Sequence, residues 1–108
     1  MDNELYLILT LRHRDMFFGG DVHLFWCKNG AGYTAILQKA GLYTKEDVEI
    51  MCRENDIPIP ISYTGYDKDF FEDNERIIKF PTLMAKTKEV DNLIADWQNE
   101  YRRKRSQR

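Results

Sequence analysis

The stretch from Glu4 to Arg12 constrains the fold more than any other part of the chain. Leucines alternate there with Tyr6, Ile8 and Thr10, at the two-residue period of a β-strand. Both faces of this strand are apolar at its centre. Because such a strand is normally covered on both sides, we expect it to lie at the centre of a sheet.

Three further segments are expected to be extended. The aromatic-rich run from Val22 to Lys28 follows two adjacent glycines and predicts the second strand of an antiparallel hairpin with a longer loop. Pro58 and Pro60 lack amide donors, so residues 57–61 are expected to form an edge strand or a polyproline-like crossing. A short strand is predicted over residues 76–80.

Two helices are predicted. Thr44, with Asp47 three residues later, resembles a capping box that starts a helix from Lys45 to Asn55. Apolar side chains recur at helical spacing from Lys88 to Arg103, with acids at the start and bases at the end. Together with the strands, these helices predict a small α+β domain: an antiparallel sheet, one middle helix and a C-terminal helix packed on the sheet.

Composition supports one domain spanning residues 1–108, since 43% of the chain is apolar and 31% is charged. No apolar run approaches the roughly 20 residues that a bilayer crossing needs, and the N-terminus lacks the pattern of a secretory signal. The two cysteines show no CxxC spacing, which agrees with a reducing compartment. We therefore expect a cytoplasmic protein without membrane contact.

Charge is distributed unevenly along the chain. Residues 1–100 hold 11 basic against 18 acidic side chains, whereas residues 101–108 hold five basic side chains and no acid. An acidic body repels a phosphate backbone, so any nucleic-acid contact has to come from the basic tail that extends the last helix. Attraction between the acidic body and the basic tail of different copies makes a homodimer a further expectation.

Catalytic and metal-binding patterns are weak. His13, His23, Cys27 and Cys52 could supply zinc ligands, but they lack the two close pairs of a structural zinc site. A buried Cys52 and a half-exposed His23 are the simpler interpretation. Cys27 lies within a strand, away from the settings that activate a thiol. No phosphate-binding glycine pattern is present, so we expect no enzyme, no cofactor and no metal.

The segment from Tyr63 to Glu75 is expected to be a polar, acidic loop around Gly65. Its carboxylates lack the spacing of an EF-hand, and aromatic residues flank them. Aromatic anchors inside a charged rim suit a protein interface. The predicted partner-binding residues are Tyr63, Tyr66, Asp67, Asp69, Phe70, Phe71, Glu72 and Asp73.

One stretch resembles a known family. Residues 26–33 read Trp-Cys-Lys-Asn-Gly-Ala-Gly-Tyr and residues 40–44 read Ala-Gly-Leu-Tyr-Thr. This pattern resembles short, largely uncharacterised proteins of phage and prophage genomes, although Cys27 replaces the basic residue usual after the Trp. The same pattern is explained structurally if Gly32 and Gly41 adopt positive φ at two turns.

The resemblance implies a small accessory protein of phage or mobile-element origin that binds a host protein stoichiometrically. We therefore expect a non-enzymatic interaction protein, such as an inhibitor of a host defence complex, whose partner has a basic surface. The alternative is a protein that binds nucleic acid or a small nucleotide. That alternative would use Tyr6, Phe25, Trp26 and Tyr33 for stacking and Arg102, Arg103, Lys104 and Arg105 for phosphate.

Overall fold

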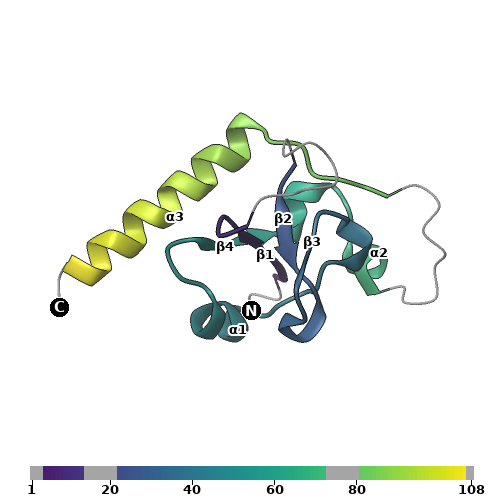
Figure 1. The fold of residues 1–108 in the computed structure, drawn as a ribbon, viewed down its shortest axis with the longest axis horizontal. Coiled ribbons are helices and arrows are strands. Elements are labelled where there is room, and N and C mark those ends of the chain that lie inside the picture. Colours follow the sequence, from purple (N-terminus) through teal and green to yellow (C-terminus); the bar gives the residue numbers. More distant parts are fainter. Residues whose placement is uncertain (1–3, 14–21, 73–80, 107–108) are drawn as a thin grey trace.

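The structure is a computed structural model that describes residues 4–13, 22–72 and 81–106 (Figure 1). It is an α+β domain built on a four-stranded antiparallel sheet of order β3-β2-β1-β4. The strands are β1 (Tyr6–Thr10), β2 (Leu24–Trp26), β3 (Tyr33–Thr34) and β4 (Asp56–Pro60). The helices are α1 (Lys45–Met51), α2 (Lys68–Glu72) and α3 (Lys88–Ser106), with short 3₁₀ turns η1 (Lys28–Gly30), η2 (Leu37–Lys39) and η3 (Ile61–Thr64).

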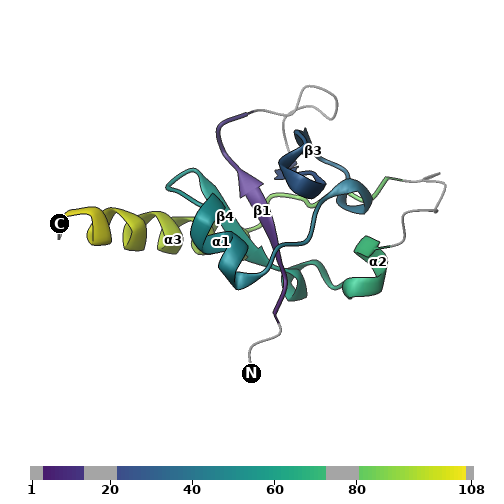
Figure 2. The same cartoon turned by 90° about the horizontal axis from the view of Figure 1, so that it is seen from below.

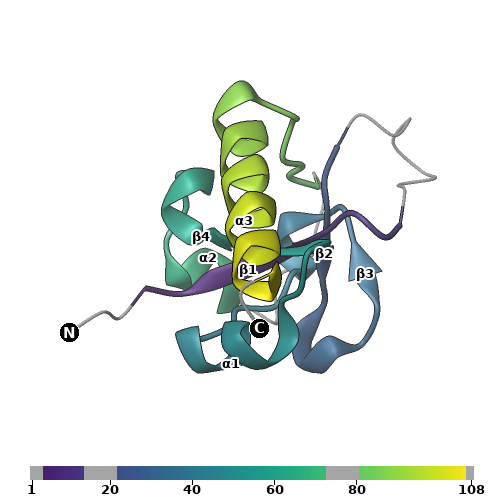
Figure 3. The same cartoon turned by 90° about the vertical axis from the view of Figure 1, so that its left-hand side faces the viewer.

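Strand β1 is central and covered on both faces, which confirms the prediction from its sequence. Leu7 and Leu9 belong to the larger apolar cluster, to which α2 and α3 contribute, whereas Ile8 belongs to a smaller cluster with Val48 of α1. Figures 1 and 3 show α3 above β1 and α1 below it. The sheet is therefore the middle layer of a three-layer packing.

The predicted hairpin of the first two strands and the edge position of residues 57–61 are also confirmed. Leu9 of β1 lies opposite Phe25 of β2, and β4 pairs with β1 at the edge of the sheet, where Pro58 faces Ile8. Because prolines carry no N–H, β4 offers donors from only some of its positions, which suits an edge strand. The short strand expected over residues 76–80 lies outside the described residues.

Helix α1 begins as predicted, because Thr44 and Asp47 form a complete capping box. It ends at Met51, four residues before the predicted end at Asn55. The Arg53 guanidinium donates hydrogen bonds of 3.1 and 2.9 Å to the carbonyl oxygens of Ile50 and Cys52. The backbone of Cys52, the C-cap, is extended, with φ −84° and ψ 138°, so the helix ends there and Arg53 satisfies carbonyls that have no helical partner.

Helix α3 starts at Lys88, where the Thr87 hydroxyl accepts a hydrogen bond from the Val90 amide. It continues to Ser106, three residues beyond the predicted end at Arg103, with basic residues in its last turn that complement the helix dipole. Figures 1 and 2 both show its C-terminal turns extending past the rest of the domain. The basic end of the chain is thus presented on a projecting helix.

One glycine differs from expectation. Gly32 has the positive φ predicted for it, 92°, but Gly41 does not. A Cβ at Gly41 would lie 2.9 Å from the Lys28 Cα and 3.0 Å from the Cys27 carbonyl oxygen. Glycine is needed at position 41 because two backbone segments approach closely there.

Candidate functional site

The surface predicted from the sequence is an ordered turn and helix instead of a loop. Gly65 ends η3 in the left-handed conformation, with φ 79°. The Thr64 hydroxyl donates to the Ile61 carbonyl (2.7 Å) and accepts from the Tyr66 amide (3.1 Å). The Asp67 carboxylate then accepts a hydrogen bond from the Phe70 amide at 3.2 Å, as an N-cap does. Local side-chain bonds thus fix the path of the chain from η3 into α2.

Phe71 is a core residue, so its assignment as a partner-binding residue is wrong. It is only 1% exposed and belongs to the larger apolar cluster, and Phe70 is partly buried against that cluster. Adjacent residues of a helix point in different directions, so only one of the two phenylalanines can be fully buried in the core when α2 packs against it. Asp73, the last residue of the predicted set, lies outside the described residues.

Tyr63 and Tyr66 remain on the surface, at 47% and 40% exposure. The Tyr66 ring stacks on the Phe70 ring with 4.0 Å between centroids and 16° between planes. Phe70 in turn meets Phe71 edge to face at 5.0 Å. Since Phe71 is fixed in the core, this chain of rings holds Tyr66 in place, and little side-chain entropy is lost when a partner covers it.

The two tyrosines border a hollow of about 430 Å³, here called the tyrosine groove. Its opposite wall comes from the extended segment of residues 81–87, here called the strap, and from the first turn of α3. The groove therefore joins parts of the chain that are about 20 residues apart. The residues that line it include Tyr63, Thr64, Tyr66, Thr82, Met84 and Glu89.

Carboxylates lie beside the groove on α2 and just before it. Asp67, Asp69 and Glu72 are exposed, against one base, Lys68. The Lys68 ammonium and the Glu72 carboxylate are 3.8 Å apart, and both side chains are more than half exposed, so this pair contributes little to stability. Residues 67–72, directly after Tyr66, therefore carry a net negative charge, whereas Lys86 and Lys88 are exposed on the strap side of the groove.

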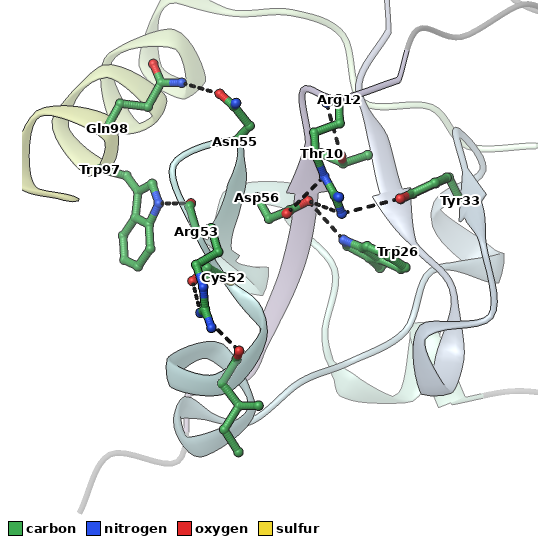
Figure 4. Close-up of polar contacts among 11 residues, drawn as sticks. Thr10, Arg12, Trp26, Tyr33, Cys52, Arg53, Asn55, Asp56, Trp97 and Gln98 are labelled. Carbon is green, nitrogen blue, oxygen red and sulfur yellow. Dashed lines mark hydrogen bonds and ion pairs between the residues drawn. The ribbon is translucent and has the colours of Figure 1, made fainter. Parts of the chain in front are cut away.

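A separate polar cluster, shown in Figure 4, joins three strands and the residues after β1. The buried Asp56 carboxylate accepts a hydrogen bond of 3.1 Å from the Trp26 indole and lies 3.2 Å from the Arg12 Nε atom. The Tyr33 ring lies 4.4 Å from the Trp26 ring. These polar groups satisfy one another's hydrogen-bonding capacity, so the cluster has a structural role in linking the strands of the sheet.

The aromatic set proposed for base stacking is not assembled as a platform. Phe25 is fully buried, which overturns its assignment as a stacking residue. The Tyr33 ring is already in contact with two rings, those of Trp26 and His13, at 4.4 and 4.1 Å. Tyr6 packs against the smaller apolar cluster.

The basic end of α3 is partly neutralised within the chain. Arg102 forms an ion pair with Glu54 in the turn before β4, and Arg103 forms one with Glu100 one helical turn earlier. Trp97 and Gln98 attach the same helix to the turn before β4, through hydrogen bonds of 2.8 and 3.1 Å (Figure 4). Of the four predicted phosphate contacts, only Lys104 and Arg105 have no ion pair among the described residues.

The histidines and cysteines do not form a reactive or metal-binding centre in the described part of the chain, where no suitable group of three ligands occurs. His23 is buried, at 4% exposure, and the expectation of a half-exposed histidine is wrong. Burial raises the pKa of the Cys27 thiol and raises the pKa of the Cys52 thiol to about 12. Both thiols are thus poor nucleophiles at neutral pH.

A second, larger hollow of about 790 Å³ lies between η1, α1 and α2. Buried rings of Tyr43 and Phe71 line it together with Lys28, Asp47 and Glu72. Its charged groups carry both signs, so they favour neither an acidic nor a basic partner. The tyrosine groove is the better candidate for a protein interface, since its two tyrosines are exposed and the carboxylates of Asp67 and Asp69 directly follow Tyr66.

Comparison with known proteins adds no relative to these observations. No protein-family model, no curated protein and no solved structure matches this chain. None of the described helices is long and apolar enough to cross a membrane.

Proposed function

We propose that this protein acts by binding another protein, without catalysis, and that the tyrosine groove is its docking surface. The observation that carries this proposal is the pair of exposed tyrosines, Tyr63 and Tyr66, on the rim of one groove. Tyrosine is among the residues that contribute most to protein interfaces, because its large ring loses little entropy on binding. The propping of Tyr66 by Phe70 supports the proposal further.

The partner has a basic surface. Asp67 and Asp69, which follow Tyr66 in the chain, and Glu89 in the groove wall place negative charge beside the tyrosines, which attracts lysine and arginine side chains and speeds their approach. A guanidinium or ammonium group can also lie over a tyrosine ring, an interaction that contributes about 0.5–2 kcal/mol. An arginine-containing segment of the partner fits both features of the site.

The finer proposal concerns biological setting. The resemblance of residues 26–44 to short phage proteins motivates a partner within a host's antiviral defence, which this protein would inhibit stoichiometrically. Such complexes often handle nucleic acid and therefore present basic grooves, to which an acidic protein is complementary. The two free cysteines agree with action in a reducing cytoplasm.

A comparison of three tagged proteins tests the proposal: the parent, Tyr63→Ser/Tyr66→Ser and the control Ile50→Ser. Ile50 is a more exposed apolar residue, at 71%, on α1 away from the groove. Co-purification from bacterial cells at low salt should retain a basic partner on the parent and on Ile50→Ser but not on the tyrosine variant. Equal retention by all three proteins, or no partner on the parent, would count against the proposal.

Charge is tested separately from the tyrosines. The double variant Asp67→Asn/Asp69→Asn should weaken capture at low salt and make the remaining binding less sensitive to salt, because rim charges act mainly on association. Asp67 also caps α2, and asparagine keeps that capping role. An unchanged salt dependence of binding would contradict the proposal that the partner has a basic surface.

A further inference from the structure

His23 is an unusual buried group next to the strap, whose residues form one wall of the tyrosine groove. It lies directly before β2 and is only 4% exposed. Its Nε2 atom is buried and has no hydrogen-bond partner among the described residues. Burying a polar nitrogen without a partner is unfavourable, and burying a positive charge there would be more so.

Hydrogen bonds join the strap to His23 and to the residues of η2. The His23 amide donates to the Met84 carbonyl at 3.3 Å, and the Leu37 amide donates to the Thr82 carbonyl at 2.8 Å. The Gln38 side chain adds a reciprocal pair of 2.9 Å bonds to Thr82. The strap meets the described residues at isolated bridges instead of a continuous ladder, and its Met84 packs in the larger apolar cluster. Opening therefore withdraws Met84 from that cluster but breaks no ladder of the four-stranded sheet.

Two charged groups act on the imidazole from its neighbourhood. Lys86 belongs to the strap and Asp91 to the first turn of α3. Burial, followed by the positive charge of Lys86, lowers the pKa of His23 below its ordinary value of 6.5, and Asp91 opposes this in part. His23 therefore remains neutral while the strap is closed at neutral pH.

We propose that His23 makes the tyrosine groove sensitive to pH, because protonation of its imidazole favours the state in which the strap has left the sheet. Opening exposes the imidazole to water and moves it away from Lys86. It also removes Thr82, Met84 and Thr87 from the groove they line. The release of the strap is independent of any partner, and only its effect on binding rests on the proposed function.

The direction follows from proton linkage. The open state binds a proton more readily than the closed state, so closing is favoured above the ordinary histidine pKa of 6.5 and becomes less favourable below it. While the open form alone is protonated, each pH unit below 6.5 shifts the equilibrium by up to about tenfold toward opening. The effect ends at the lowered pKa of the closed form.

Amide hydrogen exchange tests the proposal without a partner. The Leu37 amide, bonded to the strap, reports strap opening, whereas the Tyr43 amide, bonded to the Tyr6 carbonyl, reports on the opposite face. After correction for intrinsic exchange, protection at Leu37 should fall by up to about tenfold between one pH unit above and one below 6.5. Protection at Tyr43 should hold.

The chain has two histidines, so His13→Gln is a matched control. The loss at Leu37 should persist in His13→Gln and vanish in His23→Gln and His23→Phe. Persistence in a folded His23 variant overturns the proposal, as does equal loss at Leu37 and Tyr43 in the parent. If neither His23 variant folds, the pH dependence of exchange at the Leu37 and Tyr43 amides of the parent still tests the proposal.

A binding assay at both pH values separates this proposal from the proposed function. Loss of partner capture at the lower pH in the parent, but not in His23→Gln, links the strap to binding. Unchanged exchange at Leu37 refutes the pH response even if partner capture succeeds. Conversely, absence of a partner refutes the docking function and leaves the exchange result standing.

Discussion

Replacing Phe71 with alanine tests whether α2 is anchored in the core or is a free surface loop. Phe71 is 1% exposed and lies in the same cluster as Leu7, Phe25 and Ile59. Truncation of a buried phenylalanine costs about 3–5 kcal/mol, which combines lost burial with the cavity that remains. A domain of this size has a stability of about 5–15 kcal/mol, so the variant remains folded at 25 °C unless the parent lies at the lower end of that range.

The adjacent phenylalanine is the matched control. Phe70→Ala removes a ring that is only partly buried, so its cost should be clearly smaller. Phe71→Leu, which keeps most of the volume, should cost less than about 1.5 kcal/mol. This ordering separates core anchoring from a general sensitivity of α2.

Urea unfolding followed by far-UV circular dichroism measures the differences. For a domain of this size, each kcal/mol lowers the melting temperature by about 4–8 °C, so Phe71→Ala should melt at least about 12 °C below the parent. A loss below about 1 kcal/mol, or a larger loss for Phe70→Ala, would refute the packing described for α2.

Three further predictions concern other parts of the molecule. Gly41→Ala should destabilise the fold by about 1–3 kcal/mol in thermal melts, because its Cβ would meet the Lys28 backbone at 2.9 Å; a stability equal to the parent's would contradict the close approach. Iodoacetamide should modify Cys27 before Cys52, whose pKa is about 12, when peptides are mapped by mass spectrometry at pH 7–8; the reverse order would mean that Cys52 is accessible. Truncation after Arg103 should change stability by less than about 0.5 kcal/mol, since both described ion pairs of the tail are retained, while weakening any salt-sensitive self-association seen in sedimentation.

Elements with a strong local pattern could be predicted from the sequence. The alternation around Ile8 identified the central strand, and the Thr44 hydroxyl and the Asp47 carboxylate specified the start of α1. The long helix from Lys88 follows from its apolar spacing. In each case the residues that determine the element are close together in the sequence, which is the range over which periodicity and capping act.

Elements fixed by distant contacts could not be predicted. Helix α2 has five residues, too few for a helical period, and depends on docking of Phe71 into a core built by other strands. The groups near the buried His23, among them Met84 and Lys86, come from a segment about 60 residues later, so no neighbouring residue in the sequence indicates its burial. Gly41 likewise reflects a meeting of two backbones, where sequence reasoning favoured a positive φ.

The candidate surface shows the same division. Its location was predicted from the aromatic and acidic residues of the segment that begins at Tyr63. The sequence did not predict which of its aromatic rings face outward, because Phe70 and Phe71 are neighbours in sequence and only tertiary packing decides which of them is buried. The groove itself required the strap and the first turn of α3, which the sequence placed in no relation to Tyr66.

Site-specific photo-crosslinking tests the docking role of the tyrosine groove most directly. A benzophenone amino acid is placed at Tyr63 in one protein and at Ile50 in another, both exposed positions, and irradiated in living bacterial host cells. Crosslinking from position 63 to one basic protein, reduced by Tyr66→Ser and absent from position 50, is the predicted result. Crosslinking that is equal from both positions, or that joins position 63 to nucleic acid, would contradict the proposed docking surface.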